Sequence, residues 1–477
     1  NLPKPNMAFE MWGPSGTDLD DDADVSVLGM QPDSDYVFYA ATSYDPVQIH
    51  NQYAFELSNQ VGQWAPDYRH IELFSNMRWQ RNRNELNTVG PEDYFGVYAV
   101  MEKISRGSHR VDVASIDPSV TKTPEEAAPG EPNISGGYIW KVDRGDPGES
   151  AFSAGGGSFN WVYPKSPKSN RARPDQKATA AQEAWVRDYF TEVQRTTRDP
   201  DFNDPEGYRK YIDLDSWVEH HFINVLTFNV DAYRLSGYLH KDRDGKLAYG
   251  PVWDFDRALN STDGRDADPF VWRSEAGDRG TNFFGAGGGM QWLAPLFQKD
   301  INWWQHYIDS WDVLRKDEFS DENLHGLVDT LADEIRESQA REREECSHCS
   351  SIRPRGGWEK ELRDLKGWLS DRSGFFDSNF APPTFIRDAE GAAFDRRDDG
   401  AYVNAGAEID MVPIASVNND TALVSGVNGA ADVSYMVPVN NDLADTWTAP
   451  GFDDAAWATG KLGIGFGTSS GFEENYT

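Results

Sequence analysis

The chain has 477 residues, of which 38% are hydrophobic and 13% aromatic, so it can form a large core and is not a disordered chain. Its formal net charge of −34 disfavours nucleic acid and anionic membranes as partners. No apolar run reaches the roughly 18 residues of a transmembrane helix, so no membrane span is predicted.

Strands and one helix are predicted for the first hundred residues. Alternating or continuous apolar runs mark the strands, and Asp45 followed by Pro46 marks a helix start. The predicted strands cover 7–12, 35–42, 68–75 and 94–104, and the helix covers 45–62.

An acidic loop, 17–24, follows the first predicted strand. The alternate aspartates of 18–24 resemble a Ca²⁺ loop, but the glycine and the closing glutamate of the EF-hand pattern are missing. A solvated turn is therefore favoured over a Ca²⁺ site.

The strand over 94–104 carries Glu102 and Lys103 at its end. A Lys–Glu pair orients phosphate groups in kinase-like folds. The same residues would serve equally as a cross-strand ion pair on an exposed face, and the sequence leaves both possibilities open.

Two glycine-rich runs, 153–158 and 285–289, lack the spacing of a phosphate-binding loop and are expected to be flexible loops. A strand is predicted before the first run, over 136–143. Helices are predicted after it, over 179–196 and 216–226. His220 and His221 point to different faces of the second helix, so they cannot easily share a metal and are expected at the edge of the core.

Residues 221–260 contain the main candidate functional group. Strand-like residues 238–240, an Asp-Gly turn at 241–245 and strand-like residues 247–253 predict a β-hairpin. This hairpin would bring Asp231 near Asp254, although 23 positions (254 − 231) separate them in the sequence.

The carboxylates that this hairpin gathers need a compensating charge. Several carboxylates at one place repel one another, and Mg²⁺ prefers one or two carboxylates together with phosphate oxygens. A divalent-metal and phosphate site is therefore one hypothesis. The alternative is that Asp254 and Asp256 end a strand and cap turns.

Further helices are predicted over 291–315, from Ser320 onward and over 358–374. Between the last two lie Cys346 and Cys349. With His348 and a distant residue they could hold zinc, they could form a local disulfide in an exported protein, or they could stay free thiols in a cytosolic one.

After about residue 380 the helical periodicity disappears and short apolar runs indicate β-strands. We expect a large domain over 1–380, a linker or short β region over 381–415, and the start of a β-sandwich over 416–477. Residues 447–467 resemble the start of a jelly-roll, galactose-binding-like module. A glycan is a possible partner there, and the chain is expected to be a piece of a longer exported protein of the cell surface or extracellular space.

Along most of residues 4–380 the sequence resembles the spore coat protein H (CotH) kinase-like family. The resemblance lies in N-x-D at 229–231, Ser-Gly-Tyr at 236–238, D-x-D-G at 242–245 and G-P-V-W-D-F-D at 250–256, and in the runs 94–104 and 136–144. It implies an α+β fold of the atypical protein-kinase type. It also implies transfer of the ATP γ-phosphoryl group to a protein hydroxyl with Mg²⁺ or Mn²⁺.

The resemblance also implies roles for individual residues. Asp231 would be the base or hydroxyl-orienting carboxylate, and Asp254 would bind metal. Asp256 and Asn229 would make a second metal contact or support it. Glu102, with Lys103 or Lys4, would orient phosphates.

Two departures from the family's pattern favour an alternative function. Strands rich in Gly, Arg and Ser are absent before Lys4, and His50-Asn51 stands where the family tends to have Arg-Asn, so a fixed positive charge is missing. The alternative is a catalytically silent CotH-like domain with a structural or adhesive role in a surface protein.

Overall fold

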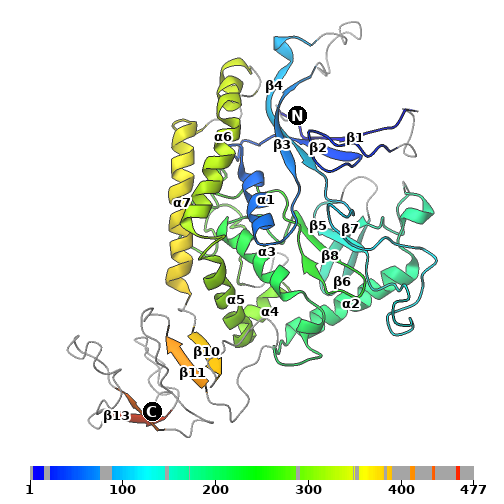
Figure 1. Ribbon diagram of the computed structural model, residues 1–477, viewed down its shortest axis with the longest axis vertical. Helices are drawn as coiled ribbons and strands as arrows, with labels where there is room; N and C mark the ends of the chain where they lie inside the picture. The colour runs from blue at the N-terminus through cyan, green and yellow to red at the C-terminus, as the bar shows by residue number, and fades with distance from the viewer. Residues whose placement is uncertain are drawn as a thin grey trace. The chain divides into compact units, whose positions relative to one another are not determined.

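The computed structural model describes residues 4–14, 22–75, 89–145, 150–170, 172–285, 291–346, 349 and 354–380, and four strands beyond them. The chain divides into two compact units, Asn1–Asn379 and Phe380–Thr477. The first unit combines helices with antiparallel sheets (Figure 1), so the predicted α+β fold is confirmed.

The first sheet of the first unit has four antiparallel strands in the order β1-β2-β4-β3. Tyr36 pairs with Glu102 in its register, and Tyr68 pairs with Met101. All four strands lie where alternation or apolar runs predict them. Their bounds are Met7–Glu10, Asp35–Tyr39, Tyr68–Phe74 and Tyr94–Glu102 for β1, β2, β3 and β4.

The second sheet has five antiparallel strands in the order β6-β7-β5-β8-β9. The predicted hairpin is its β8–β9 pair, in which Leu239 pairs with Tyr249. The bounds are Tyr138–Val142 for β5, Ala151–Ala154 for β6, Gly157–Tyr163 for β7, Gly237–Lys241 for β8 and Ala248–Tyr249 for β9.

The first glycine-rich run is part of this sheet, so the expectation of a flexible loop over 153–158 is wrong. Gly155 and Gly156 have φ of 53° and 77° and form the turn between β6 and β7. Tight hairpin turns require positive φ at the central residues, which glycine adopts without strain. Most of the second glycine-rich run lies outside the described residues.

Two helices begin close to their predicted starts, whereas the helix predicted from Asp45 begins only at His50. Thr179 caps α2 and Ser320 caps α6, each accepting a hydrogen bond from a backbone N–H of the first turn. Their bounds are His50–Gln60 for α1, Ala180–Arg198 for α2, Leu214–Leu226 for α3, Leu293–Lys299 for α4, Ile301–Leu314 for α5, Asp321–Glu345 for α6 and Trp358–Asn379 for α7; short 3-10 helices lie at Pro91–Asp93, Pro174–Gln176 and Tyr208–Lys210.

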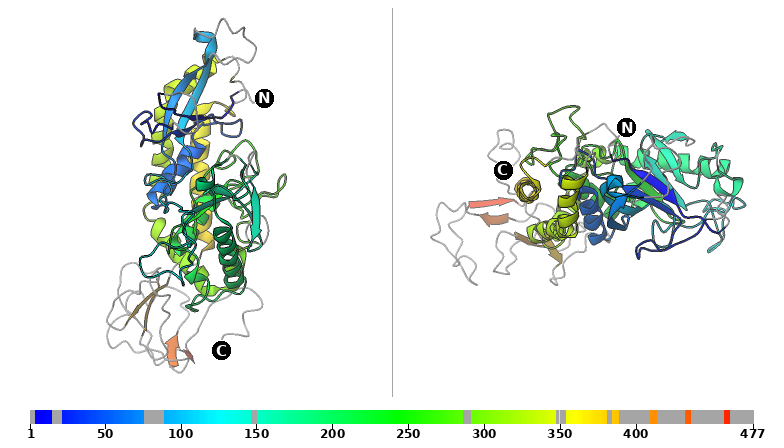
Figure 2. Two further views of the ribbon diagram at one scale, coloured as in Figure 1. Left: turned by 90° about the vertical axis from the view of Figure 1, so that its right-hand side faces the viewer. Right: turned by 90° about the horizontal axis from the view of Figure 1, so that it is seen from above.

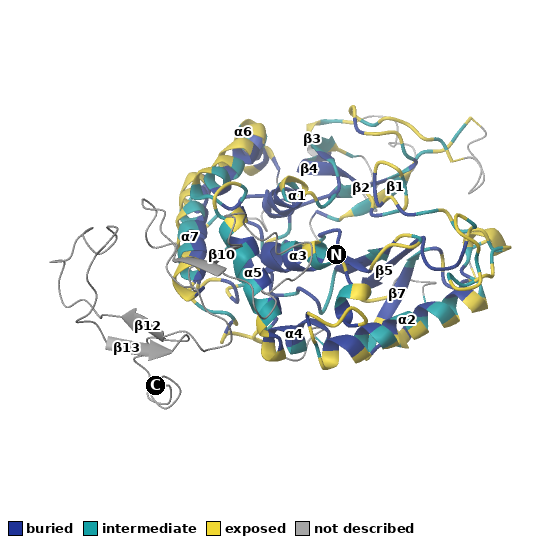
Figure 3. Ribbon diagram, turned by 60° about the horizontal axis from the view of Figure 1, so that its bottom comes forward, coloured by how far each residue is buried: buried dark blue, intermediate teal, exposed yellow. Residues whose placement is uncertain are grey.

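Helix α3 lies at the centre of the first unit and is largely buried (Figure 3). It contacts α1, α5, α7 and β9, while α6 and α7 run side by side and α6 also covers β4 (Figures 1 and 2). His220 and His221 are therefore core residues, 4% and 0% exposed, and not residues of the core edge.

Cys346 and Cys349 form a disulfide directly after α6. Of the three alternatives for these cysteines, the local disulfide is the one observed. Both cysteines are buried against Tyr94, so the bridge holds the chain after α6 against the start of β4.

The second unit is described only through two antiparallel strand pairs, β10 (Thr384–Asp388) with β11 (Ile409–Pro413) and β12 (Asp432–Tyr435) with β13 (Ala458–Lys461). The rest of the predicted linker over 381–415 and of the predicted β-sandwich over 416–477 lies outside the described residues. Most of the jelly-roll-like run 447–467, the predicted glycan-binding part, also lies outside the described residues. The same is true of most of the acidic loop 18–24. Within the described part of the chain, no helix combines the length and apolarity needed to cross a membrane.

Candidate functional site

The segment that carries Asp254 and Asp256 follows β9, and the start of α1 hydrogen-bonds to it. Asn51 Oδ1 accepts the backbone N–H of Phe255 at 2.7 Å, and both residues are 1% exposed. Asp254 has a φ of 64°, in the left-handed region. Asn51 and the burial of Phe255 therefore hold a turn that a non-glycine residue rarely adopts.

His50 lies beside Asn51, against the backbone of Asp256. Burial lowers its pKa from the ordinary value, so it is neutral at pH 7. The sequence comparison expected no fixed positive charge at residue 50, and the lowered pKa of His50 agrees with this expectation. His50 and Asn51 instead support the Asp254–Asp256 turn through backbone contacts.

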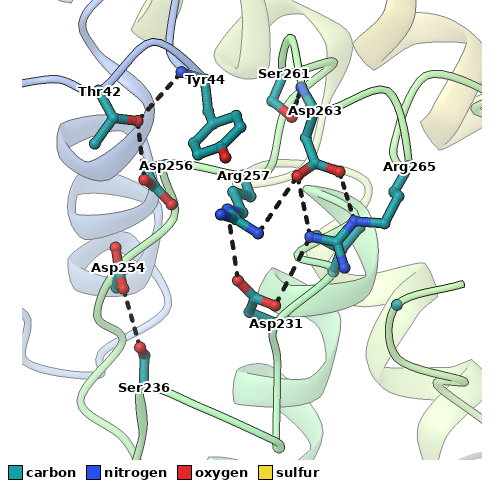
Figure 4. Close-up of polar contacts among 12 residues, drawn as sticks. Thr42, Tyr44, Asp231, Ser236, Asp254, Asp256, Arg257, Ser261, Asp263 and Arg265 are labelled. Carbon is teal, nitrogen blue, oxygen red and sulfur yellow. Dashed lines mark hydrogen bonds and ion pairs between the residues drawn. The ribbon is translucent and has the colours of Figure 1, made fainter. Parts of the chain in front are cut away.

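Asp254 and Asp256 each accept one hydroxyl hydrogen bond (Figure 4). Ser236 Oγ donates to Asp254 at 3.0 Å, and Thr42 Oγ1 donates to Asp256 at 2.9 Å. Burial, with the neighbouring charge of Asp254, raises the pKa of Asp256 to about 7. Burial also raises the pKa of Asp254, and the charges of Asp231 and Asp143 act in the same direction. The two carboxylates thus lack a sufficient local countercharge.

The side chain of Asp254 is in contact with solvent although protein surrounds it densely on most sides. Within the described part of the chain, no three or more His, Cys, Asp or Glu side chains gather into a metal cage. Two carboxylates open to solvent nevertheless fit Mg²⁺, which takes its remaining ligands from water and phosphate oxygens.

Asp231 follows α3, and Asn229 sets its position. Asn229 Oδ1 accepts the backbone N–H of Asp231 at 3.1 Å, while its Nδ2 donates to Asn224 Oδ1 at 3.0 Å. Asn229 is 3% exposed. Its amide is engaged within the protein, so of its two predicted roles the geometry favours support over direct contact.

Three arginines surround Asp231, and sequence reasoning missed all of them. Arg234 donates to Asp231 Oδ1 at 2.5 Å. Arg265 lies 3.9 Å from the same oxygen, and Arg257 lies 4.0 Å from Oδ2 (Figure 4). Only Arg234 has a local sequence signal, because it follows Asp231 by three positions. Arg257 and Arg265 are distant from Asp231 in the sequence, and no local signal could have identified them.

Glu102 and Lys103 do not form the predicted phosphate-orienting pair. Glu102 is 1% exposed, accepts the N–H of Asp67 at 3.0 Å and lies 3.9 Å from Arg110. Lys103 is exposed and bonds Asp35 at 3.0 Å. Successive residues of an extended chain point to opposite faces, which separates the two side chains.

Lys4, the other candidate partner of Glu102, is also engaged elsewhere. Its Nζ donates to Glu342 Oε2 at 2.8 Å and to the carbonyl of Val97 at 2.7 Å. Burial lowers its pKa from the ordinary value. Lys4 is a buried partner of α6, and the pair Lys4–Glu102 is not made.

A cleft of about 890 Å³ separates the ends of β2 and β4 from the second sheet. Its walls carry Lys103, Lys141, Tyr238 and Trp253, and Lys141 pairs with Tyr238 across β5 and β8. Asp143, which also lines the cleft, acts electrostatically on Asp254. Asp254 and Asp256 do not line the cleft themselves, but Trp253, which does, directly precedes Asp254 in the chain.

The chain matches the family described as CotH kinase protein over residues 9–376. The match contains the second sheet, the first sheet except the start of β1, all the aspartates of the site and the cleft lysines, but not Lys4. No curated protein matches the chain. The family match supports a kinase-like function in general and, in general terms, the use of ATP and a divalent metal. Since the matched range covers more than half of its sequence, the chain belongs to the CotH kinase protein family.

Proposed function

We propose that the first unit is an exported, metal-dependent atypical protein kinase that transfers the γ-phosphoryl group of ATP to a protein hydroxyl. The observation that carries this proposal is the pair Asp254 and Asp256. Both carboxylates have raised pKa values, and they directly follow Trp253, which lines a cleft that contains both lysines and aspartates. A pair of this kind is what a divalent ion and a phosphate chain would stabilise.

The cleft between the two sheets is the proposed nucleotide site. Lys103 and Lys141 reach it from opposite walls, and Trp253 connects it directly to Asp254 in the sequence. In an acidic protein, local cations of this kind are needed to hold a polyanion. Lys141 thereby takes the role that the sequence suggested for Lys4.

The proposed reaction needs one proton acceptor and one charge-neutralising group. The substrate hydroxyl oxygen bonds to the γ-phosphorus, the bond from that phosphorus to the bridging oxygen breaks, and ADP leaves. Asp231 receives the hydroxyl proton on Oδ2, which accepts no hydrogen bond from any described residue. A divalent ion at Asp254 and Asp256 would neutralise the charge of the phosphates.

Export is supported by the Cys346–Cys349 disulfide, because disulfides persist in oxidising compartments and are rare in the cytosol.

A catalytically silent domain is the second candidate function. Asp231 Oδ1 is engaged by Arg234, and neither Lys103 nor Lys4 pairs with Glu102. A protein of this kind would keep the fold and lose phosphoryl transfer.

Nucleotide binding measured by calorimetry separates the two functions. We expect the parent protein to bind ATP only when Mg²⁺ or Mn²⁺ is present, and Asp254→Ala to abolish this binding. Asp377→Ala is the matched control, because Asp377 lies at the end of α7 and pairs with Arg315. No binding by the parent at millimolar nucleotide would favour the silent domain.

A further inference from the structure

Six charged side chains form one network beside the site. The acidic members are Asp231, Asp263 and Asp278, and the basic members are Arg234, Arg257 and Arg265. They come from the loop after α3 and from the segment that follows the Asp254–Asp256 turn. The network therefore includes the proposed base, and through Arg257 it adjoins the proposed metal-binding turn along the chain. Figure 4 shows its members Asp231, Arg257, Asp263 and Arg265.

Two of the arginines are fixed by direct hydrogen bonds. Arg265 is 7% exposed and donates to both Asp263 and Asp278. Arg234 donates to Asp231 and, at 3.0 Å, to Asp278. Their guanidinium groups hold the network together.

Arg257 differs from both. Its guanidinium lies 3.5 Å from Asp263 and 4.0 Å from Asp231 Oδ2, and it makes no hydrogen bond to any described residue. Its side chain is 33% exposed, and its charged group lies 4.2 Å from the centre of the Tyr44 ring. Stacking on that ring holds the arginine in place while its donors stay available to a ligand.

The position of Arg257 is as important as its available donors. It lies beside the one oxygen of Asp231 that accepts no hydrogen bond from a described residue, and it follows Asp256 directly in the chain. Its charge also acts on both Asp254 and Asp256. A γ-phosphoryl group moving from a nucleotide held at Asp254 and Asp256 to a hydroxyl held at Asp231 would lie near this guanidinium.

We propose that Arg257 binds the γ-phosphate of the nucleotide and exchanges its loose ion pairs with Asp231 and Asp263 for that contact. This inference rests on the proposed kinase function. A planar guanidinium donates two parallel hydrogen bonds to phosphate oxygens, which suits a group whose charge spreads during transfer. Arg257 would then be catalytic, while Arg234 and Arg265 position Asp231.

A simpler alternative is that Arg257 only offsets the surrounding carboxylates. In that case its loss would weaken the binding of ATP and ADP to the same extent. A γ-phosphate contact predicts a loss confined to ATP, because ADP has no γ-phosphate.

The test is calorimetry with ADP and with a non-hydrolysable ATP analogue, both in Mg²⁺, on the parent, Arg257→Gln and Arg257→Met. Arg257→Met keeps a long side chain against Tyr44. Arg195→Gln removes the same charge from α2, where Arg195 is exposed and pairs with Glu192, and serves as the control. Melting temperatures show which variants are folded.

We expect each folded Arg257 variant to lose about ten-fold or more in affinity for the ATP analogue and to keep its affinity for ADP. Equal losses for both nucleotides, or no loss, would overturn the role of Arg257 and leave the kinase function standing. Failure of the parent to bind either nucleotide would overturn the kinase function, and this inference with it.

Discussion

Asn51 illustrates how much of the candidate site depends on single buried side chains. Its carboxamide oxygen is the hydrogen-bond acceptor for Phe255, the residue between Asp254 and Asp256. The turn has a left-handed residue, Asp254, so it does not form from local preference alone. A residue far away in sequence therefore fixes the geometry of the carboxylates.

We predict that Asn51→Ala destabilises the protein by about 1–3 kcal/mol, because it leaves the buried N–H of Phe255 without an acceptor. Metal-dependent nucleotide affinity should fall as well, since the turn loses its anchor. Denaturant unfolding and calorimetry measure the two effects. The control is Asn379→Ala, which removes an exposed amide that bonds Phe375 at the end of α7 and should cost less than about 0.5 kcal/mol. Equal costs for the two variants would contradict the anchor role.

At the scale of elements, α6 connects the first sheet to the helical part of the first unit. Its apolar face contains Leu324, Val328, Leu331 and Ile335, all buried. Its last turn places Glu342 against the backbone N–H of Val97 at 2.6 Å and against Lys4. The helix is thus joined to β4 by a buried ion pair in addition to apolar packing.

We predict that Glu342→Leu destabilises the first unit by about 3–5 kcal/mol, because it leaves the buried Lys4 charge without its partner. The double variant Lys4→Met with Glu342→Leu should lose less than the sum of the two single variants. Unfolding free energies of all four proteins form a double-mutant cycle that measures this coupling. Additive effects would show that the pair contributes no coupling, and the argument for an ionic link would fail.

At the scale of the whole molecule, buried titratable groups make stability depend on pH in opposing directions. Burial lowers the pKa of His220 and of His221 to about 3, so acid favours the unfolded chain, which binds the protons. Burial raises the pKa of Asp266 to about 7, so acid favours the folded chain through this group. The pH profile of the parent sums these contributions, and a single group is isolated only by comparison with a variant.

The variant Asp266→Asn isolates the contribution of Asp266 to the pH dependence of stability. The carboxylate accepts the N–H and the hydroxyl of Ser261, and the residue is fully buried. Its folded pKa lies above its unfolded pKa, so its contribution to stability is lost as pH rises through about 7. Relative to the parent, the variant should gain about 2–3 kcal/mol between pH 5 and pH 8. Unfolding free energies at both pH values measure this gain, and a difference that does not change with pH would show that Asp266 stays ionised throughout.

Local chemistry in the sequence was sufficient to predict most elements of the first unit. Thr179 and Ser320 mark helix starts, the Asp-Gly turn marks the β8–β9 hairpin, and apolar runs mark the strands of the first sheet. Asp45 marks a start as well, but α1 begins only at His50. The carboxylate of Asp45 accepts backbone N–H groups from Val47, Gln48 and His50, which holds the intervening residues in a loop.

The sequence by itself determined the α+β class, most of the secondary structure, the family resemblance and the candidate aspartates, because caps, turns and periodicity depend on near neighbours. Only the tertiary structure decided which charges meet. Lys4 pairs with Glu342, 338 residues away, and Arg257 and Arg265 reach Asp231 from a segment beyond the hairpin. Ion pairs of this kind depend on how distant segments pack, and no local pattern specifies that distance or direction.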